Sequence, residues 1–172
     1  MSNKHLYSLL TIAVATFVLT ACTISYKFNG TVIDYSKVKT IAITDFTNRA
    51  PMVYAPLAVR FNEKIKDTYV RQTRLELTDR NGDLELEGEI TGYDITPQSM
   101  NANSLSAETR LTIRIQVRYT NNTNPDENFE RSYSAYRNFD SSKLITEVQD
   151  DLIEEIVDEI CNNIYNDTVA NW

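Results

Sequence analysis

The sequence predicts an α+β fold, a two-layer sandwich in which two helices pack on a four-stranded sheet in the order β-α-β-β-β-α. Three observations lead to this class. Apolar and polar residues alternate along three segments after residue 83, which is typical of half-buried strands. Two other segments repeat apolar residues every three or four positions, which is typical of helices. A sheet with one apolar face needs a covering layer, and two helices can supply it.

The first half of the domain is predicted to contain one strand and one helix. Residues 38–46 are rich in β-branched and apolar residues, which favours a strand. Pro56 suits the first turn of a helix, and apolar residues at every fourth position extend that helix to about residue 72. These are Leu57, Phe61, Ile65 and Tyr69. Residues 74–78 are expected to add at most a short extended piece, and Asn81-Gly82 marks a turn.

Three strands are predicted to follow, over residues 84–97, 107–119 and 129–137. In the first of them, alternation places one set of residues on a common face: Leu84, Leu86, Gly88, Ile90 and Gly92. The alternation is clearest over residues 107–119. Because turns join these strands, we expect an antiparallel meander.

A long amphipathic helix is predicted to end the domain, over residues 142–165, with Asp140, Ser141 or Ser142 as its N-terminal cap. One face carries an apolar stripe from Ile145 to Ile164. The other face is acidic. It could bind cations or a basic partner, although a solvated helix face is the more common explanation of such a pattern.

The N-terminus reads as an export signal. Lys4 precedes an uncharged, mostly apolar run, and the small residue Ala21 stands just before Cys22, as in a secretory signal with its cleavage site. The run is short for a spanning helix, which needs roughly 20 apolar residues. We therefore divide the chain into a signal peptide (1–21), a tether (22–36), an α+β domain (37–165) and a C-terminal tail (166–172).

The last residues of the signal, Leu19, Thr20, Ala21 and Cys22, resemble the lipobox of bacterial lipoproteins. The resemblance implies diacylglycerol on the Cys22 thiol and a further acyl chain, such as palmitate, on its freed amine. Two or three acyl chains make a durable membrane anchor. Thr23 follows instead of the aspartate that retains lipoproteins in the inner membrane, so we expect an outer-membrane protein that faces the periplasm. An ordinary signal peptide, or an N-terminal membrane anchor with Cys22 incidental, is the alternative.

The composition of the chain argues against several classes of function. The chain has a net charge of −7, and removal of residues 1–21 takes away Lys4 and no acid, which leaves −8 on the mature chain. An acidic chain is a poor general binder of nucleic acid. The single histidine, His5, leaves with the signal, so the mature chain has no histidine for Ser-His or Cys-His catalysis or for metal binding. Paired-carboxylate catalysis does not need histidine and is a third interpretation, but it has little support in this sequence. We expect no enzyme, no cofactor and no metal site.

A basic strip is the candidate binding site. Arg110, Arg114 and Arg118 fall on the polar face of the strand 107–119 at even spacing, so their side chains should point the same way. Guanidinium groups bind phosphate in a fork, which suggests an anion site for phosphates or a lipid headgroup. The alternative is a solvated sheet face on which the arginines pair with glutamates of a neighbouring strand, such as Glu85, Glu87 or Glu89.

Two further features have structural explanations. The acidic turn 79–83 has carboxylates at calcium-loop spacing, but its glycine is misplaced for an EF-hand. Cys161 lies at the edge of an apolar stripe, where a packed thiol is expected.

Two short stretches carry a family resemblance: Gly88-Glu89-Ile90-Thr91-Gly92-Tyr93, and Tyr136-Arg137-Asn138-Phe139-Asp140 before the last helix. Together with the lipobox and the element order, they resemble the LptE family of outer-membrane lipopolysaccharide-assembly lipoproteins. The resemblance implies a lipoprotein that plugs a β-barrel lipopolysaccharide translocon of the LptD type, helps it to fold and binds lipopolysaccharide. It implies no catalytic residues.

Residues 39–48 support a second interpretation. They resemble the first strand of the periplasmic domains of the TolB-amino-terminal, curli-secretion and synthase-activator group. That resemblance implies a periplasmic lipoprotein acting in envelope assembly, as an activator of wall synthases or part of an export assembly.

Overall fold

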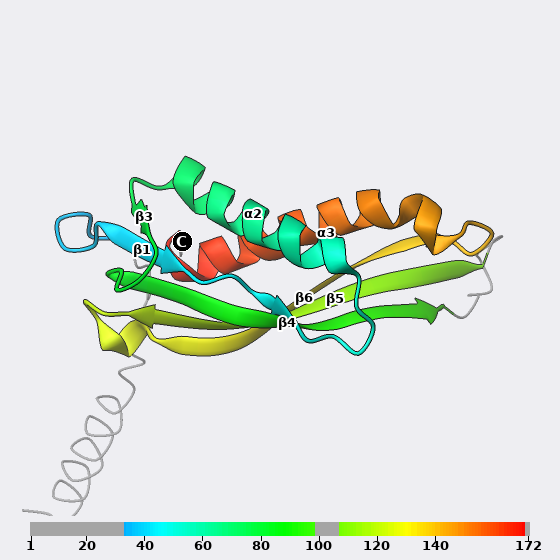
Figure 1. The fold of residues 1–172 in the computed structure, drawn as a ribbon, viewed down its shortest axis with the longest axis horizontal. Coiled ribbons are helices and arrows are strands. Elements are labelled where there is room, and N and C mark those ends of the chain that lie inside the picture. The colour runs from blue at the N-terminus through cyan, green and yellow to red at the C-terminus, as the bar shows by residue number, and fades with distance from the viewer. Residues whose placement is uncertain (1–32, 99–106, 171–172) are drawn as a thin grey trace, which may run out of the picture.

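The computed structural model describes residues 33–98 and 107–170, which form two layers (Figure 1). Helices α2 (Ala55–Gln72) and α3 (Ile145–Thr168) lie side by side on one face of a sheet. The strands are β1 (Thr40–Ile43), β2 (Thr47–Asn48), β3 (Glu76–Thr78), β4 (Leu84–Pro97), β5 (Glu108–Asn121) and β6 (Phe129–Asp140), with a 3-10 turn η1 (Pro125–Glu127) before β6. The predicted α+β class is confirmed.

Within the described residues the sheet has six strands where four were predicted. The order is β3-β1-β4-β5-β6, and β2 pairs with β4 beyond the end of β1. β1 runs parallel to β3 and β4, whereas β4, β5 and β6 form the expected antiparallel meander. The additional strands β2 and β3 have two and three residues, too few for an alternating pattern to reveal. β3 falls in the segment where a short extended piece was expected.

β4 contains an irregularity that changes which side chains face the core. Its pairing with β5 shifts between Ile90 and Gly92, so Thr91 is an extra residue and the alternation changes phase there. Leu84, Leu86 and Ile90 are buried under the helices as predicted. The placement of Gly92 on that face was wrong: it lies on the outer face opposite Arg114, and Tyr93 faces the core. A strict two-residue period cannot reveal a bulge.

The core lies between the sheet and the two helices. All four predicted apolar residues of α2 are fully buried, and α3 contributes six apolar side chains. The latter are Ile153, Ile156, Val157, Ile160, Cys161 and Ile164. A buried hydrogen bond of 2.5 Å joins the Tyr69 hydroxyl of α2 to Thr168 Oγ1 of α3. Ile33 and Val169 are also buried, so both ends of the described chain pack on this core.

The start of α3 differs from the prediction. β6 continues to Asp140, and the Ser141 N–H donates to the Ala107 carbonyl at 3.0 Å, because the β5–β6 pairing extends past the alternating pattern. Asp140 therefore caps a turn by accepting from the Ser142 N–H, and the predicted caps were wrong. The helix begins at Ile145 instead, where Glu147 Oε2 accepts from the Leu144 N–H at 3.1 Å. It ends at Thr168, three residues after the predicted end.

Candidate functional site

The face of the sheet opposite the helices carries the predicted basic strip. Strand β5 alternates apolar residues toward the helices with Arg110, Arg114 and Arg118 toward the other side, and Figure 1 shows both helices on a single face. The three arginines therefore share one outer face, as their spacing predicted. Each has a different set of neighbours, and these neighbours decide what each guanidinium can bind.

Arg118 is held between two carboxylates. Its Nη1 donates to Glu87 Oε1 of β4 at 3.0 Å, and its Nε lies 3.4 Å from Glu130 Oε2 of β6. The hydrogen bond that Arg118 donates to Glu87, followed by the charge of Glu130, raises the pKa of Arg118. Glu87 was among the predicted partners, whereas Glu130 was not. Its place beside Arg118 depends on the β5–β6 register, which alternation alone does not specify.

Arg114 lies across the outer surface of Gly92 and pairs with Asp94. Its Nη2 is 2.6 Å from Asp94 Oδ2, and a Cβ at Gly92 would fall 2.9 Å from Arg114 Nε. The bulge at Thr91 brings Gly92 and Asp94 to this face, so the pairing could not be read from strict alternation. The Thr91-Gly92 pair within a strand pattern was the available signal.

Arg110 differs from the other two arginines. Its guanidinium stacks on the exposed ring of Tyr136 at 3.9 Å from the centroid, and its Nε donates to Asn138 Oδ1 at 3.0 Å. Among the described residues no carboxylate lies within 4.0 Å of this guanidinium, whereas Arg114 and Arg118 both form ion pairs. Arg110 is therefore the arginine whose charge is least compensated by the protein itself.

The outer face as a whole is acidic. The register of β4, β5 and β6 places seven carboxylates beside the three arginines. They belong to Glu85, Glu87, Glu89, Asp94, Glu108, Glu130 and Asp140. The predicted strip is thus a row of positive charge beside an acidic row on β4, with further carboxylates at the two ends of β6. The neighbouring-strand pairing considered as the alternative occurs at Arg118 and Arg114.

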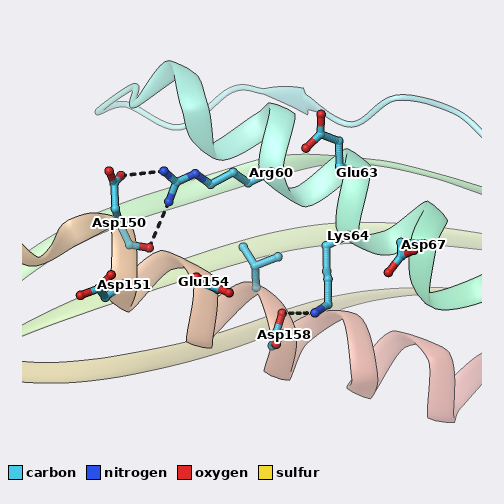
Figure 2. Close-up of a pocket in the computed structure, with 9 residues that line it drawn as sticks. Arg60, Glu63, Lys64, Asp67, Asp150, Asp151, Glu154 and Asp158 are labelled. Carbon is cyan, nitrogen blue, oxygen red and sulfur yellow. Dashed lines mark hydrogen bonds and ion pairs between the residues drawn. The ribbon is translucent and has the colours of Figure 1, made fainter.

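The acidic face of α3 meets α2 across a groove of about 660 Å³ (Figure 2). Arg60 of α2 lies 3.0 Å from Asp150 Oδ1 and also donates to the Asp150 carbonyl, and Lys64 Nζ lies 2.6 Å from Asp158 Oδ1. The hydrogen bond with Asp158 raises the pKa of Lys64. Part of the acidic face therefore pairs with the neighbouring helix. No described His, Cys, Asp or Glu residues form a group of three suited to a metal ion.

The other features have structural roles. Asp83 Oδ2 accepts from the backbone N–H groups of Lys39 at 2.8 Å and Thr40 at 3.0 Å, which ties the acidic turn to β1. Cys161 is buried in the core as a packed thiol, as expected, and this burial raises the pKa of the thiol. The predicted lipobox, Leu19, Thr20, Ala21 and Cys22, lies outside the described residues. None of the helices described is long and apolar enough to cross a membrane.

These features define a class of protein: a small α+β module whose described helices α2 and α3 lie on one face of the sheet, while the other face is charged. The family within that class follows from comparison with known proteins. Residues 38–168 match the LptE family, described as Lipopolysaccharide-assembly. The chain belongs to this family, and the resemblance inferred from its short motifs is confirmed. None of the curated proteins matches the chain.

Several solved structures are similar to this fold. The minor lipoprotein from Acinetobacter baumannii is 13% identical, with 74% of this chain and 89% of that chain covered and a TM-score of 0.46. The rare lipoprotein B from Shewanella oneidensis is 11% identical, with 74% and 89% covered and a TM-score of 0.48. A PelC dodecamer from Paraburkholderia phytofirmans is 9% identical, with 83% and 96% covered and a TM-score of 0.49.

Proposed function

We propose that this chain is an outer-membrane lipoprotein that works inside a β-barrel lipopolysaccharide translocon of the LptD type, helps that barrel to fold and binds lipopolysaccharide in transit. The family match over residues 38–168 carries the proposal, because the family is one of lipopolysaccharide assembly. In this proposal a lipid on Cys22 anchors the domain from the periplasmic side. The domain acts by binding and positioning, without catalysis.

Within this function we assign the lipopolysaccharide contact chiefly to Arg110. The predicted site comprises Arg110, Arg114 and Arg118, but Arg114 and Arg118 must give up bonded carboxylates before they can bind phosphate. Arg110 keeps its Nη groups for a ligand while Tyr136 and Asn138 hold its position. An exposed aromatic ring beside a guanidinium suits a phosphorylated sugar, since the ring packs on the sugar and the fork binds phosphate.

Single substitutions in the mature protein test this assignment. A charge-assisted hydrogen bond contributes about 1.5–3 kcal/mol, so Arg110→Gln should weaken binding of purified lipopolysaccharide by about tenfold or more. Arg118→Gln is the matched control on the same strand and face, and we expect less than about a twofold change because Glu87 and Glu130 already neutralise this guanidinium. Circular dichroism checks that both variants are folded. Unchanged affinity in folded Arg110→Gln would refute the assignment.

The partner is tested separately. The mature chain should co-purify with the barrel in mild detergent, and its depletion should lower both the barrel yield and the amount of surface lipopolysaccharide. Normal amounts of both after complete loss of the chain would contradict the assembly function. Co-purification with a wall synthase in place of the barrel would support the second interpretation, an envelope-assembly lipoprotein of the TolB-amino-terminal, curli-secretion and synthase-activator type.

A further inference from the structure

The two edges of the sheet are built differently. β3 forms one edge and has only three residues, which is a common way to keep an edge from pairing with other chains. β6 forms the other edge and has twelve residues. It pairs with β5 without a bulge and contains neither proline nor lysine, the usual protecting residues. The β6 edge is therefore long and regular, without a proline, lysine or bulge to interrupt pairing.

The register shows which backbone groups point away from the sheet. Ser141 donates to Ala107, so this residue pair is hydrogen-bonded, and alternation makes every odd-numbered residue of β6 bond to β5. The N–H and C=O groups of Glu130, Ser132, Ser134 and Tyr136 consequently point to the free edge. Outside the β5–β6 ladder, the one described hydrogen bond to these groups runs from Arg137 Nη1 to the Tyr136 carbonyl at 2.8 Å.

Nothing in the described chain covers this edge. All even-numbered residues of β6 are exposed, and α3 lies on the helix face of the strand, joined to it by the ion pairs of Arg137 and Arg131. Ser132 and Ser134 stand at the centre of the edge, and their small side chains let another backbone approach. An exposed row of backbone donors and acceptors of this kind is a template for an added strand.

The charge along the edge indicates the partner. Five carboxylates and four guanidinium groups lie along β6, on the neighbouring flank of α3 and at the β5 arginines that contact β6, for a net charge of −1. The carboxylates belong to Glu130, Asp140, Glu155, Glu159 and Asp167, and the guanidinium groups to Arg110, Arg118, Arg131 and Arg137. Pairing of β6 with a second copy would bring two such acidic flanks together, which is unfavourable. A basic strand has the complementary charge.

We propose that the free edge of β6 binds an extended segment of a partner protein with basic side chains, which adds a strand to the sheet beside residues 130–136. Backbone hydrogen bonds to the outward groups supply the binding, and the acidic flank selects for lysine or arginine. This inference rests on the strand pairing alone and does not depend on the role of Arg110 or on lipopolysaccharide.

Amide hydrogen exchange, measured by NMR on the mature protein in mild detergent, tests this addition of a strand to β6. The probe is a ten-residue peptide of alternating lysine and threonine. Saturating peptide should slow exchange of the Ser132, Ser134 and Tyr136 amides by about tenfold or more, while the Tyr133 and Ala135 amides, already bonded to β5, stay unchanged. A glutamate-threonine peptide is the matched control and should leave all five amides unaffected.

Two changes isolate the backbone contribution. N-methylation of every second peptide amide removes the donors that pair with β6 and should abolish the slowing without altering the protein. Ser134→Pro removes an outward N–H that β5 does not use, so it should also abolish the slowing of exchange by the lysine peptide. Ser134→Ala keeps this N–H, so the slowing should remain.

Three outcomes would overturn the inference. The lysine peptide does not slow amide exchange, the glutamate peptide slows it equally, or the slowing persists when the peptide is N-methylated. Slowing of the same amides with protein concentration in the absence of peptide would assign the edge to a second copy of the chain. A lipopolysaccharide affinity that depends on Arg110, measured in the same samples, would remain valid in each of these cases.

Discussion

At the scale of single residues, two glycines of β4 make room for neighbours on opposite faces. A Cβ at Gly88 would lie 2.1 Å from the Gln116 carbonyl oxygen and 2.6 Å from the buried ring of Phe46. The three atoms nearest to a Cβ at Gly92 would all belong to the guanidinium of Arg114, the closest at 2.9 Å. The neighbours of Gly88 are a backbone carbonyl and a core ring, which cannot move aside. The neighbour of Gly92 is the end of an exposed arginine side chain, which can.

This difference predicts unequal costs for the same substitution. Gly88→Ala should lower the free energy of unfolding by about 1–3 kcal/mol, as overpacking of a core does. Gly92→Ala should lower it by less than about 1 kcal/mol, because only the exposed Arg114–Asp94 ion pair is disturbed. Urea denaturation of both variants measures the two values. Equal costs would show that Phe46 does not occupy the space above Gly88.

Asp83 gives a pH-dependent prediction. Hydrogen bonds, first from the Lys39 N–H and also from Thr40, lower the pKa of Asp83 in the folded state. The stabilisation is therefore complete above the unfolded pKa of about 3.9 and is lost as the pH falls through the lower folded value. Asp83→Asn should be less stable than wild type at pH 7, and the difference should shrink below about pH 4. A difference that grows on acidification contradicts this account.

At the scale of elements, the N-terminus of α3 depends on Glu147. Its carboxylate accepts from the Leu144 N–H at 3.1 Å and sits in the first turn, where a negative charge is favourable. Glu147→Ala should therefore lower the free energy of unfolding by about 0.5–1 kcal/mol in thermal or urea unfolding. Asp140→Ala, at the cap first predicted, is the control. Because Asp140 caps only the exposed turn before the helix, a larger loss there than at Glu147 would restore the original prediction.

At the scale of the whole molecule, attachment to the membrane is predicted to depend on Cys22. The residues before it resemble a lipobox, and acyl chains supply the anchor. Cys22→Ala should leave a soluble or unprocessed precursor, seen by membrane fractionation and by mass spectrometry of the first residue. Thr23→Ala keeps the lipobox and should stay acylated. A wild-type mature protein with no acyl mass on its first residue would exclude a lipid anchor.

Much of this architecture was determined by the sequence itself. The periods of two and of about 3.6 residues predicted β4, β5, β6, α2 and α3, because burial of one face imposes these periods. The shared outer face of Arg110, Arg114 and Arg118 followed from the same rule. The short motifs at residues 88–93 and 136–140, together with the lipobox and the order of elements, indicated the family that residues 38–168 match.

Only the tertiary structure decided the rest. The bulge at Thr91, the short strands β2 and β3 and the extension of β6 to Asp140 all depend on pairing between strands, which local periodicity does not contain. The same pairing decided the chemistry of the arginine strip: it placed Asp94 beside Arg114 and Glu87 with Glu130 beside Arg118, and it left Arg110 on Tyr136 without a carboxylate partner among the described residues. Alternation determines the face on which a side chain lies, but strand register determines its neighbours, because those neighbours come from distant parts of the chain.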